Sequence, residues 1–203
     1  MHIIDISNDL LTAEVFDGDP VPELTSVKSI GDGDICNLSA LYTGLHNGTH
    51  MDAPLHFIDG GDSIDKLSPE VFIGPCTVLQ VSPGIITGEV VEEYFPRNVK
   101  RLLLKSNGRA YIHKSAADAM AYQGYTLIGT DGQTVEPQNS NGETHKSLLG
   151  YDIALLEGLN LSEVSNGEYF LIAPPVRISS AEAAPVRALL ITDYIFWSGK
   201  PER

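Results

Sequence analysis

Short apolar runs alternate with turn-forming residues along most of the chain. Most of these runs are rich in β-branched or aromatic residues and end at Gly, Pro or Asp, a pattern that favours strands. Several are apolar at successive positions, as in strands that are covered on both faces. The pattern therefore predicts buried strands at 77–81, 101–105, 126–129, 153–156, 169–173 and 186–192.

Two longer segments carry helix signals at both ends. Thr87 is a typical N-cap, acidic residues follow it, and Pro96 stops the helix. Ser115 starts a capping-box-like Ser-Ala-Ala-Asp sequence, and Gly124 marks the end of that helix. A third, short helix is expected at about residues 141–149.

The strand at 101–105, the helix that begins at Ser115 and the strand at 126–129 form a β-α-β unit, which is expected to cross over right-handed. Hydrophobic residues make up 42% of the 203 residues and charged residues 20%, an ordinary balance for a globular protein with a sizeable core. No repeat, low-complexity tract or linker divides the chain. We therefore expect one α/β domain over residues 1–203, built on a mixed sheet with few helices.

The formal net charge of −14 narrows the range of partners. Such a chain repels phosphate backbones and anionic lipid, so neither nucleic acid nor a membrane is an expected partner. No apolar run approaches the roughly 18 residues of a membrane helix, and the N-terminus lacks the regions of a signal peptide. Cys36 and Cys76 have no CxxC partner and are expected to stay reduced; a structural disulfide between them is the alternative. These features predict a cytoplasmic protein.

The candidate chemistry lies in the eleven residues His46-Asn-Gly-Thr-His-Met-Asp-Ala-Pro-Leu-His56, which hold half of the six histidines. Imidazole and carboxylate groups together suit a borderline divalent ion such as zinc or manganese. Gly48 and Pro54 argue against a regular helix or a central strand across this run. We expect a bent loop that presents three histidines and an aspartate; the alternative is a polar loop with incidental histidines.

Two residues in the C-terminal half are candidates for further ligands. His145 is expected on the short helix, where a histidine that stood alone would be a surface residue. Glu157 ends the apolar run 153–156, and a carboxylate at the end of a buried strand is costly unless it is paired or bound to a metal. The alternative for Glu157 is a salt-bridged or solvent-facing side chain. Taken with the first loop, both residues are expected to be ligands.

These residues carry a resemblance to a known family. The motifs are His46-x-Gly-Thr-His50-x-Asp52-Ala-Pro-x-His56, Ile128-Gly-Thr-Asp131, Val135-Glu-Pro137, Thr144-His-Lys146-x-Leu-Leu149, Leu156-Glu-Gly-Leu159 and Ala184-Pro-Val-Arg-Ala188. Together they resemble the cyclase-like metal-dependent hydrolases, a family that includes bacterial kynurenine formamidase and isatin hydrolase. The resemblance covers most of the chain, and the length and the segment 169–175 look most like the kynurenine formamidase branch.

The resemblance implies a swivelling β/β/α fold, a homo-oligomer such as a dimer or tetramer, and two divalent metal ions per chain. One ion would be held by His46, His50 and Asp52, and the other by Asp52, His145 and Glu157. Asp52 would therefore bridge the two ions. Zinc is the expected metal and manganese the alternative, because mixed nitrogen and oxygen ligands accommodate both.

The implied activity is hydrolysis of a C–N bond in a small amide. Metal coordination lowers the pKa of water toward about 7, and the resulting metal-bound hydroxide would attack a carbonyl whose oxygen a metal ion polarises. His56 would be the general acid/base, since an unperturbed imidazole pKa near about 6.5 suits proton transfer. A fifth ligand or a supporting residue are the alternatives for His56. The best single substrate is N-formylkynurenine, which an arylformamidase of tryptophan catabolism converts to kynurenine and formate.

Other readings of the same residues differ in substrate or in turnover. The second candidate substrate is a cyclic amide, as in isatin hydrolases. Polyketide cyclisation is an alternative reaction. The remaining alternative is a protein that binds metal but catalyses no reaction. In formamidases a Trp-Pro-Gly-Asp-like segment gives the substrate pocket an aromatic wall. Here the segment 16–20 holds Phe16 and no tryptophan, since the only tryptophan is Trp197. Phe16 is expected to pack against an aromatic amide, but this departure weakens the transfer of the kynurenine substrate.

Three polar residues have open roles. Asp131 follows a buried strand and is expected either in a turn or as the partner that orients a ligand histidine. Thr49 is placed to donate a hydrogen bond near the metals, but a threonine in a loop needs no such role. His113 is expected on the surface.

Overall fold

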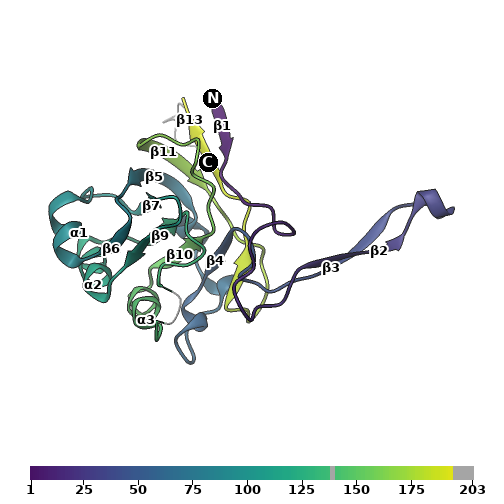
Figure 1. Ribbon diagram of the computed structural model, residues 1–203, viewed down its shortest axis with the longest axis horizontal. Helices are drawn as coiled ribbons and strands as arrows, with labels where there is room; N and C mark the ends of the chain where they lie inside the picture. Colours follow the sequence, from purple (N-terminus) through teal and green to yellow (C-terminus); the bar gives the residue numbers. More distant parts are fainter. Residues whose placement is uncertain (138–139, 194–203) are drawn as a thin grey trace, which may run out of the picture.

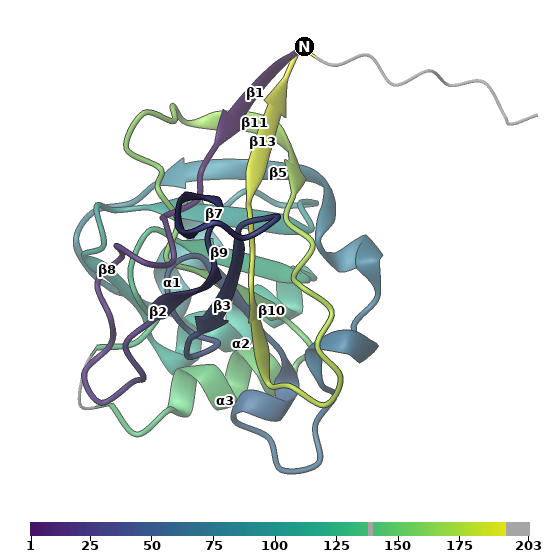
Figure 2. The same cartoon turned by 90° about the vertical axis from the view of Figure 1, so that its right-hand side faces the viewer.

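A nine-stranded mixed sheet forms the centre of the molecule (Figure 1; Figure 2). The computed structural model describes residues 1–137 and 140–193. In their order across the sheet the strands are β1 (His2–Asp5), β13 (Leu189–Thr192), β11 (Gly167–Ile172), β5 (Ile73–Gln80), β7 (Arg101–Lys105), β9 (Leu127–Thr130), β10 (Ala154–Glu157), β4 (His50–Asp52) and β12 (Ala183–Pro185).

The middle of this sheet is parallel and its two flanks are antiparallel. β7 pairs in parallel with β5 and with β9, and β10 pairs in parallel with β9. Helix α2 (Lys114–Gln123) lies between β7 and β9 in the chain, so the predicted β-α-β unit is confirmed. The remaining neighbours in the sheet pair antiparallel, including β4 with both β10 and β12. The expectation of a mixed sheet is therefore also confirmed.

Each of the six predicted apolar runs contributes to a strand of the sheet, although only the run 101–105 has the observed bounds. β5 starts earlier than predicted, at Ile73. The run 186–192 is only partly a strand, because β13 begins at Leu189. Between β12 and β13, the Val186 N–H donates a hydrogen bond to the Thr49 carbonyl oxygen at 2.9 Å. The backbone therefore changes its hydrogen-bonding partners between these two strands.

The described residues contain three α-helices, at the places where the sequence predicts them: α1 (Gly88–Tyr94), α2 and α3 (Glu143–Gly150). α2 ends at Gly124, whose φ of 81° is left-handed as expected. The predicted N-cap of α2 is wrong. His113 is the N-cap instead of Ser115, and the His113 Nδ1 accepts a hydrogen bond from the Ser115 N–H at 3.2 Å. His113 is exposed, as predicted, and no helix in the described part of the chain is long and apolar enough to span a membrane.

Both faces of the sheet are covered, which explains the continuous apolar runs. Leu102, Leu104 and Ile128 pack in a core that includes residues of α1, α2 and α3, and these helices lie together on one side of the sheet (Figure 1). Leu103 and Leu127 come from the same two strands and pack in the core on the opposite face, because successive side chains of a strand alternate. Full burial of each such leucine stabilises the fold by roughly 1.5–3 kcal/mol.

Two small ribbons and four short 3₁₀ segments complete the described structure. β6 (Gly84–Ile86) and β8 (Ala110–Ile112) form a parallel pair. β2 (Glu23–Lys28) and β3 (Leu38–Tyr42) form an antiparallel ribbon that projects far from the sheet (Figure 1), and every residue of these two strands is exposed. The 3₁₀ segments are η1 (Ile30–Asp32), η2 (Pro54–His56), η3 (Ile64–Lys66) and η4 (Pro69–Val71).

The end of β10 is packed directly against the start of β4. The Thr49 hydroxyl donates to the Gly158 carbonyl oxygen at 2.5 Å and accepts a hydrogen bond from the Asn8 N–H at 2.8 Å. Gly158 has a φ of 66°, and a Cβ at this position would overlap the Gly48 carbonyl oxygen. Glycine is required at position 158 both by its left-handed backbone and by this close approach.

A methyl group at position 158 tests this packing. We expect Gly158→Ala to lower the free energy of unfolding by about 3 kcal/mol or more, because the methyl group adds a clash to a strained backbone. Gly124→Ala is the matched control, since its φ is 81° but nothing lies within 4 Å of its Cβ position. The control should cost only about 1–2 kcal/mol. Urea unfolding of both variants measures the difference, and equal losses would contradict this account of the Gly158 turn.

Candidate metal centre

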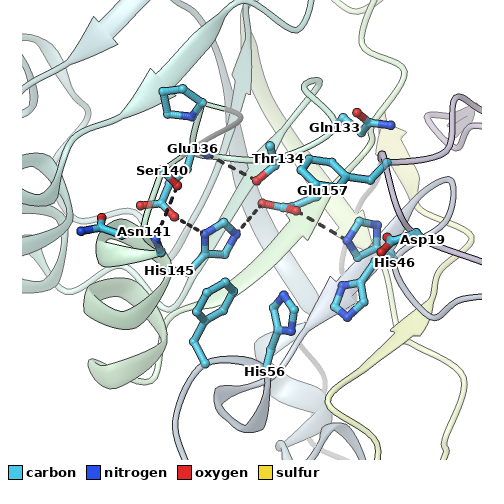
Figure 3. Close-up of a pocket in the computed structure, with 15 residues that line it drawn as sticks. Asp19, His46, His56, Gln133, Thr134, Glu136, Ser140, Asn141, His145 and Glu157 are labelled. Atoms are coloured by element: carbon cyan, nitrogen blue, oxygen red, sulfur yellow. Dashed lines mark hydrogen bonds and ion pairs between the residues drawn. The ribbon is translucent and has the colours of Figure 1, made fainter.

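The structure brings all six predicted chemical groups together at one end of the parallel strands. His46 lies in the loop before β4, His50 and Asp52 lie on β4, and His56 lies in η2. Helix α3 supplies His145, and the end of β10 supplies Glu157. Figure 3 shows His46, His56, His145 and Glu157 converging on one cavity. The two halves of the site, far apart in sequence, thus meet in space.

The expectation of a bent loop is wrong for the middle of the motif. Residues 50–52 form β4, an inner strand that pairs with β10 on one side and β12 on the other. Gly48 lies before this strand and Pro54 after it, so the two residues bound a three-residue strand rather than prevent it. Because side chains alternate along a strand, His50 and Asp52 project from the same face.

The first group of candidate ligands consists of His46, His50 and Asp52, whose ligand atoms all lie within 4.8 Å of one another. The Asp52 Oδ1 is 3.0 Å from the His46 Nδ1 and 3.5 Å from the His50 Nε2. The His50 Nδ1–H donates to the Gly48 carbonyl oxygen at 3.1 Å. This hydrogen bond leaves the Nε2 of His50 free to bind a metal ion.

The second group consists of Asp52, His145 and Glu157, again with ligand atoms within 4.8 Å of one another. The His145 Nε2 is 3.5 Å from the Glu157 Oε1, and the His50 Nε2 is 3.5 Å from the Glu157 Oε2. The Glu157 Oε1 also accepts the Val135 N–H at 2.8 Å, which fixes the carboxylate. Asp52 belongs to both groups. The family resemblance implies such a shared position for a carboxylate that bridges two ions.

Unpartnered polar atoms at the centre of the site support metal binding. Asp52 has an exposed fraction of 0%. Both of its carboxylate oxygens, and the His50 Nε2, are buried without a hydrogen-bond partner. A buried charge without partners is strongly destabilising, and such groups are normally paired or coordinate a metal. The nitrogen and oxygen donors present fit zinc or manganese.

The pKa shifts of these groups indicate a site whose ionised carboxylates attract a cation. Burial lowers the pKa of His50 and of His145, but neighbouring carboxylates raise these pKa values to about 9 and about 10. Burial would raise the pKa of Asp52, yet His46, whose Nδ1 lies 3.0 Å from the Asp52 Oδ1, and the other nearby imidazoles lower it. Burial and Asp52 both raise the pKa of Glu157, and the histidines lower it overall. The carboxylates are therefore ionised at neutral pH, and a metal ion must displace protons from the imidazoles.

His56 belongs to neither group of ligand atoms. Its ring stacks on that of His46 with the centroids 4.1 Å apart, and it meets the Phe57 ring edge-on at 4.4 Å. Phe57 in turn stacks on His145 at 4.5 Å. Burial lowers the pKa of His56 below its usual value, so the ring is mostly neutral at pH 7. A neutral imidazole at the wall of the cavity can accept a proton.

The site opens into a cavity of about 520 Å³. Phe16, predicted to contact substrate, lines it together with Phe57, and the labelled polar residues Gln133 and Asn141 complete the wall (Figure 3). Trp197, the only tryptophan, lies outside the described residues. The volume lies in the usual range for small-molecule sites, about 300–1,000 Å³.

Comparison with known proteins identifies the family. Residues 4–137 match a family model described as "Putative cyclase". A kynurenine formamidase from Sphingopyxis alaskensis is 37% identical over an alignment that covers 93% of this chain and 97% of its own. The chain belongs to the cyclase family.

Solved structures extend this result to the whole fold. A predicted metal-dependent hydrolase from Bacillus stearothermophilus has 25% sequence identity and a TM-score of 0.80, with 93% of this chain and 97% of that chain covered. Isatin hydrolase A from Labrenzia aggregata has a TM-score of 0.77 at 21% identity, with 93% of each chain covered, which shows the shared fold alone. The resemblance to cyclase-family metal-dependent hydrolases is therefore confirmed.

Glu136 is a part of this cyclase-family site that the residue patterns did not single out. It occurs in the quoted motif Val135-Glu-Pro137, but nothing in that motif indicates a role. Its carboxylate accepts a hydrogen bond from the His145 Nδ1–H at 2.6 Å (Figure 3) and another from the Thr144 N–H at 2.5 Å. Burial would raise the pKa of Glu136, but the bond from His145 lowers it to about 2. Glu136 therefore orients the Nε2 of His145 toward Glu157.

Asp131 has a different role from the one that Glu136 fills. Its carboxylate accepts hydrogen bonds from the backbone N–H groups of Ser106, Asn107 and Gly108 and from the Ser106 hydroxyl, all at 2.8–3.0 Å. These bonds organise the loop after β7. Asp131 was expected either in a turn or as the partner that orients a ligand histidine. Its hydrogen bonds fit the first of these roles and not the second.

The contact between Glu136 and His145 leads to a prediction about metal affinity. Glu136→Gln should weaken zinc binding by about 10–100-fold, because the amide lacks the charge that holds the ligand imidazole. Competition with a chromogenic chelator at pH 7 measures the dissociation constant. Glu168→Gln, an exposed position on β11, is the control and should bind zinc like the unaltered protein. Equal affinities for both variants would remove Glu136 from the metal centre.

Proposed function

We propose that this protein is a binuclear metal-dependent arylformamidase that hydrolyses N-formylkynurenine to kynurenine and formate. The observation that carries the proposal is the pair of candidate ligand groups that share Asp52 at the base of an aromatic-walled cavity. Its relatives support the reaction, since the similar proteins from Sphingopyxis alaskensis and Salinibacter ruber are kynurenine formamidases. The chemistry is hydrolysis of a C–N bond that is not a peptide bond.

Each ligand in this proposal has a position that supports its role. His46 and His50 would hold one ion with Asp52, while His145 and Glu157 would hold the other with the same carboxylate. The sharing of Asp52 reduces the repulsion between two cations bound close together. Zinc is the proposed metal, and manganese is the alternative for the same donor set.

The reaction needs a nucleophile, an electrophile and a proton carrier. Divalent ions bound by these residues would supply the first two, by lowering the pKa of water and by polarising the amide oxygen. His56 supplies the third: its neutral ring lines the cavity beside His46, takes a proton from the attacking water and delivers it to the leaving amide nitrogen. Most members of the two groups of candidate ligands are buried, which limits the access of bulk water to them.

The cavity walls support an aromatic substrate. Phe16 comes from the segment before β2 and Phe57 from the segment after η2, so two separate parts of the chain provide aromatic rings to one cavity. An aryl ring that stacks between or against such side chains gains roughly 0.5–1.5 kcal/mol beyond simple burial. We propose that these residues hold the ring of N-formylkynurenine while the formamide faces the metals.

One departure favours a second candidate substrate, a cyclic amide of the isatin type. Phe16 stands in the segment where the formamidases have a tryptophan, so the wall that selects the substrate differs from theirs. The resemblance to isatin hydrolase A is one of fold and leaves this alternative to experiment. Association into a homo-oligomer and the swivelling β/β/α classification of the fold also stay predictions.

Hydrolysis of N-formylkynurenine by enzyme loaded separately with zinc and with manganese tests the proposed function. We expect rapid turnover, followed by the absorbance of kynurenine, that disappears on chelation and returns with one of the two metals. Isatin, assayed in parallel, is the competing substrate. Turnover of isatin alone by protein that holds its metal would reject the formamidase and retain the hydrolase.

The role of His56 is tested by its truncation. His56→Ala should lower kcat by about 10²–10⁴-fold while the metal content per chain stays unchanged, because the ring carries protons and does not ligate. Metal content is read by inductively coupled plasma mass spectrometry. His2→Ala, an exposed histidine on β1, is the control for loss of an imidazole. Loss of metal in His56→Ala would instead make His56 a ligand.

A further inference from the structure

His46 is the most exposed of the three candidate ligand histidines. Its side chain is 21% exposed, against 2% for His50 and 7% for His145. It also lies in the loop before β4, whereas His50 lies on the strand and His145 on α3. A histidine that binds a metal ion needs a fixed ring orientation, which a hydrogen-bond acceptor on its other ring nitrogen normally provides. We therefore expect His46 to depend on such an acceptor more than the other two histidines do.

The ring nitrogen of His46 that faces the candidate metal centre is Nδ1. It lies 3.0 Å from the Asp52 Oδ1, yet both carboxylate oxygens of Asp52 lack a hydrogen-bond partner. This close approach is therefore not a hydrogen bond. Two atoms that bind one ion at about 2.0 Å are themselves roughly 3 Å apart, so the spacing is that of two ligands of a shared ion. His46 is thus placed to bind through Nδ1.

The other ring nitrogen of His46 faces a carboxylate outside the cluster. A neutral imidazole that binds a metal through Nδ1 carries its proton on Nε2. The Glu182 Oε1 lies 3.5 Å from the His46 Nε2, and no other ion-pair partner of this nitrogen occurs in the described part of the chain. The Glu182 backbone is fixed beside the motif, because its carbonyl oxygen accepts a hydrogen bond from the Ala53 N–H at 2.9 Å. The ring of His46 therefore lies between Asp52 on the inside and Glu182 on the outside.

We propose that Glu182 is a positioning residue, which accepts the Nε2–H of His46 and so presents the Nδ1 to the metal ion. The proposal rests on the metal site of the proposed function and not on its substrate. The Glu182 side chain is 40% exposed, belongs to neither group of candidate ligand atoms and does not line the cavity. It would therefore contact neither metal nor substrate and would act through His46 alone.

The two other candidate ligand histidines have partners of the same kind. The His50 Nδ1–H donates to the Gly48 carbonyl oxygen at 3.1 Å, and the His145 Nδ1–H donates to Glu136 at 2.6 Å. In both of these rings the Nε2 remains for the metal ion. In His46 the arrangement is reversed, because its Nδ1 faces the site and its Nε2 faces a carboxylate. The proposal therefore requires one histidine of each chain to bind through Nδ1 and two to bind through Nε2.

Removal of the Glu182 carboxylate tests its effect on metal affinity. Glu182→Ala should weaken zinc binding by about 5–10-fold, near the lower end of the range for partners of ligand histidines, because water screens a partly exposed charge. Competition with a chromogenic chelator at pH 7 measures the dissociation constant. Glu163→Ala, which removes an exposed glutamate that also lies outside the strands, is the control and should bind zinc like the unaltered protein. Equal zinc affinities for the two variants would overturn the proposal.

Nitrogen-15 NMR of the zinc-loaded protein, labelled on its histidines, tests the reversed ring directly. In the unaltered protein one zinc-bound ring should bind through Nδ1 and two through Nε2, and Glu182→Ala should shift only the N–H proton of the first. Coordination of every bound ring through Nε2, or an N–H proton that the variant leaves in place, would each overturn the proposal. Neither measurement uses a substrate. Failure to hydrolyse N-formylkynurenine would therefore reject the proposed function without affecting this result.

Discussion

The carboxylate of Asp52 is the group on which the site depends. It is fully buried in an inner strand, and its two oxygens have no hydrogen-bond donor. A carboxylate in such a place is very unfavourable unless positive charge surrounds it. His46 and His50 lower its pKa, Asp52 in turn raises the pKa of His145, and these imidazoles are the ligands that divalent ions prefer. The need to compensate one buried charge and the need to bind metal are therefore met by the same side chains.

The backbone around β4 is arranged to keep these groups in register. β4 has only three residues, but it is hydrogen-bonded on both sides, and glycines at 48 and 158 let the neighbouring turn approach closely. Glu136 then holds the His145 ring from outside the cluster. A short strand that is paired on both sides is a rigid support, and its alternating side chains place His50 and Asp52 on one face without any special loop conformation.

Sequence patterns predicted the parts of this structure in which local signal and burial agree. The runs at 101–105 and 126–129 are apolar at successive inner positions because neighbouring side chains such as Leu102 and Leu103 face different cores. β4 was missed as a strand, since three residues between Gly48 and Pro54 carry no periodicity and owe their extended form to the strands on either side. The role of Glu136 depends on a contact with α3 that no local pattern encodes. The candidate ligands were identified through their chemistry and spacing, and through resemblance to a family.

The way in which β4 is inserted into the sheet links metal binding to folding. Its partners are residues 155–157 and 183–185, more than a hundred positions along the chain, so the ligand set is complete only after these distant segments have docked. Contacts of such separation form slowly and late, because a long loop must close before they contribute. An ion that binds only the finished arrangement stabilises the native state as a whole, by about 2.7 kcal/mol when its free concentration is a hundred times the dissociation constant. In a cell, the supply of metal would thus influence how long this chain survives proteolysis as well as how fast it turns over substrate.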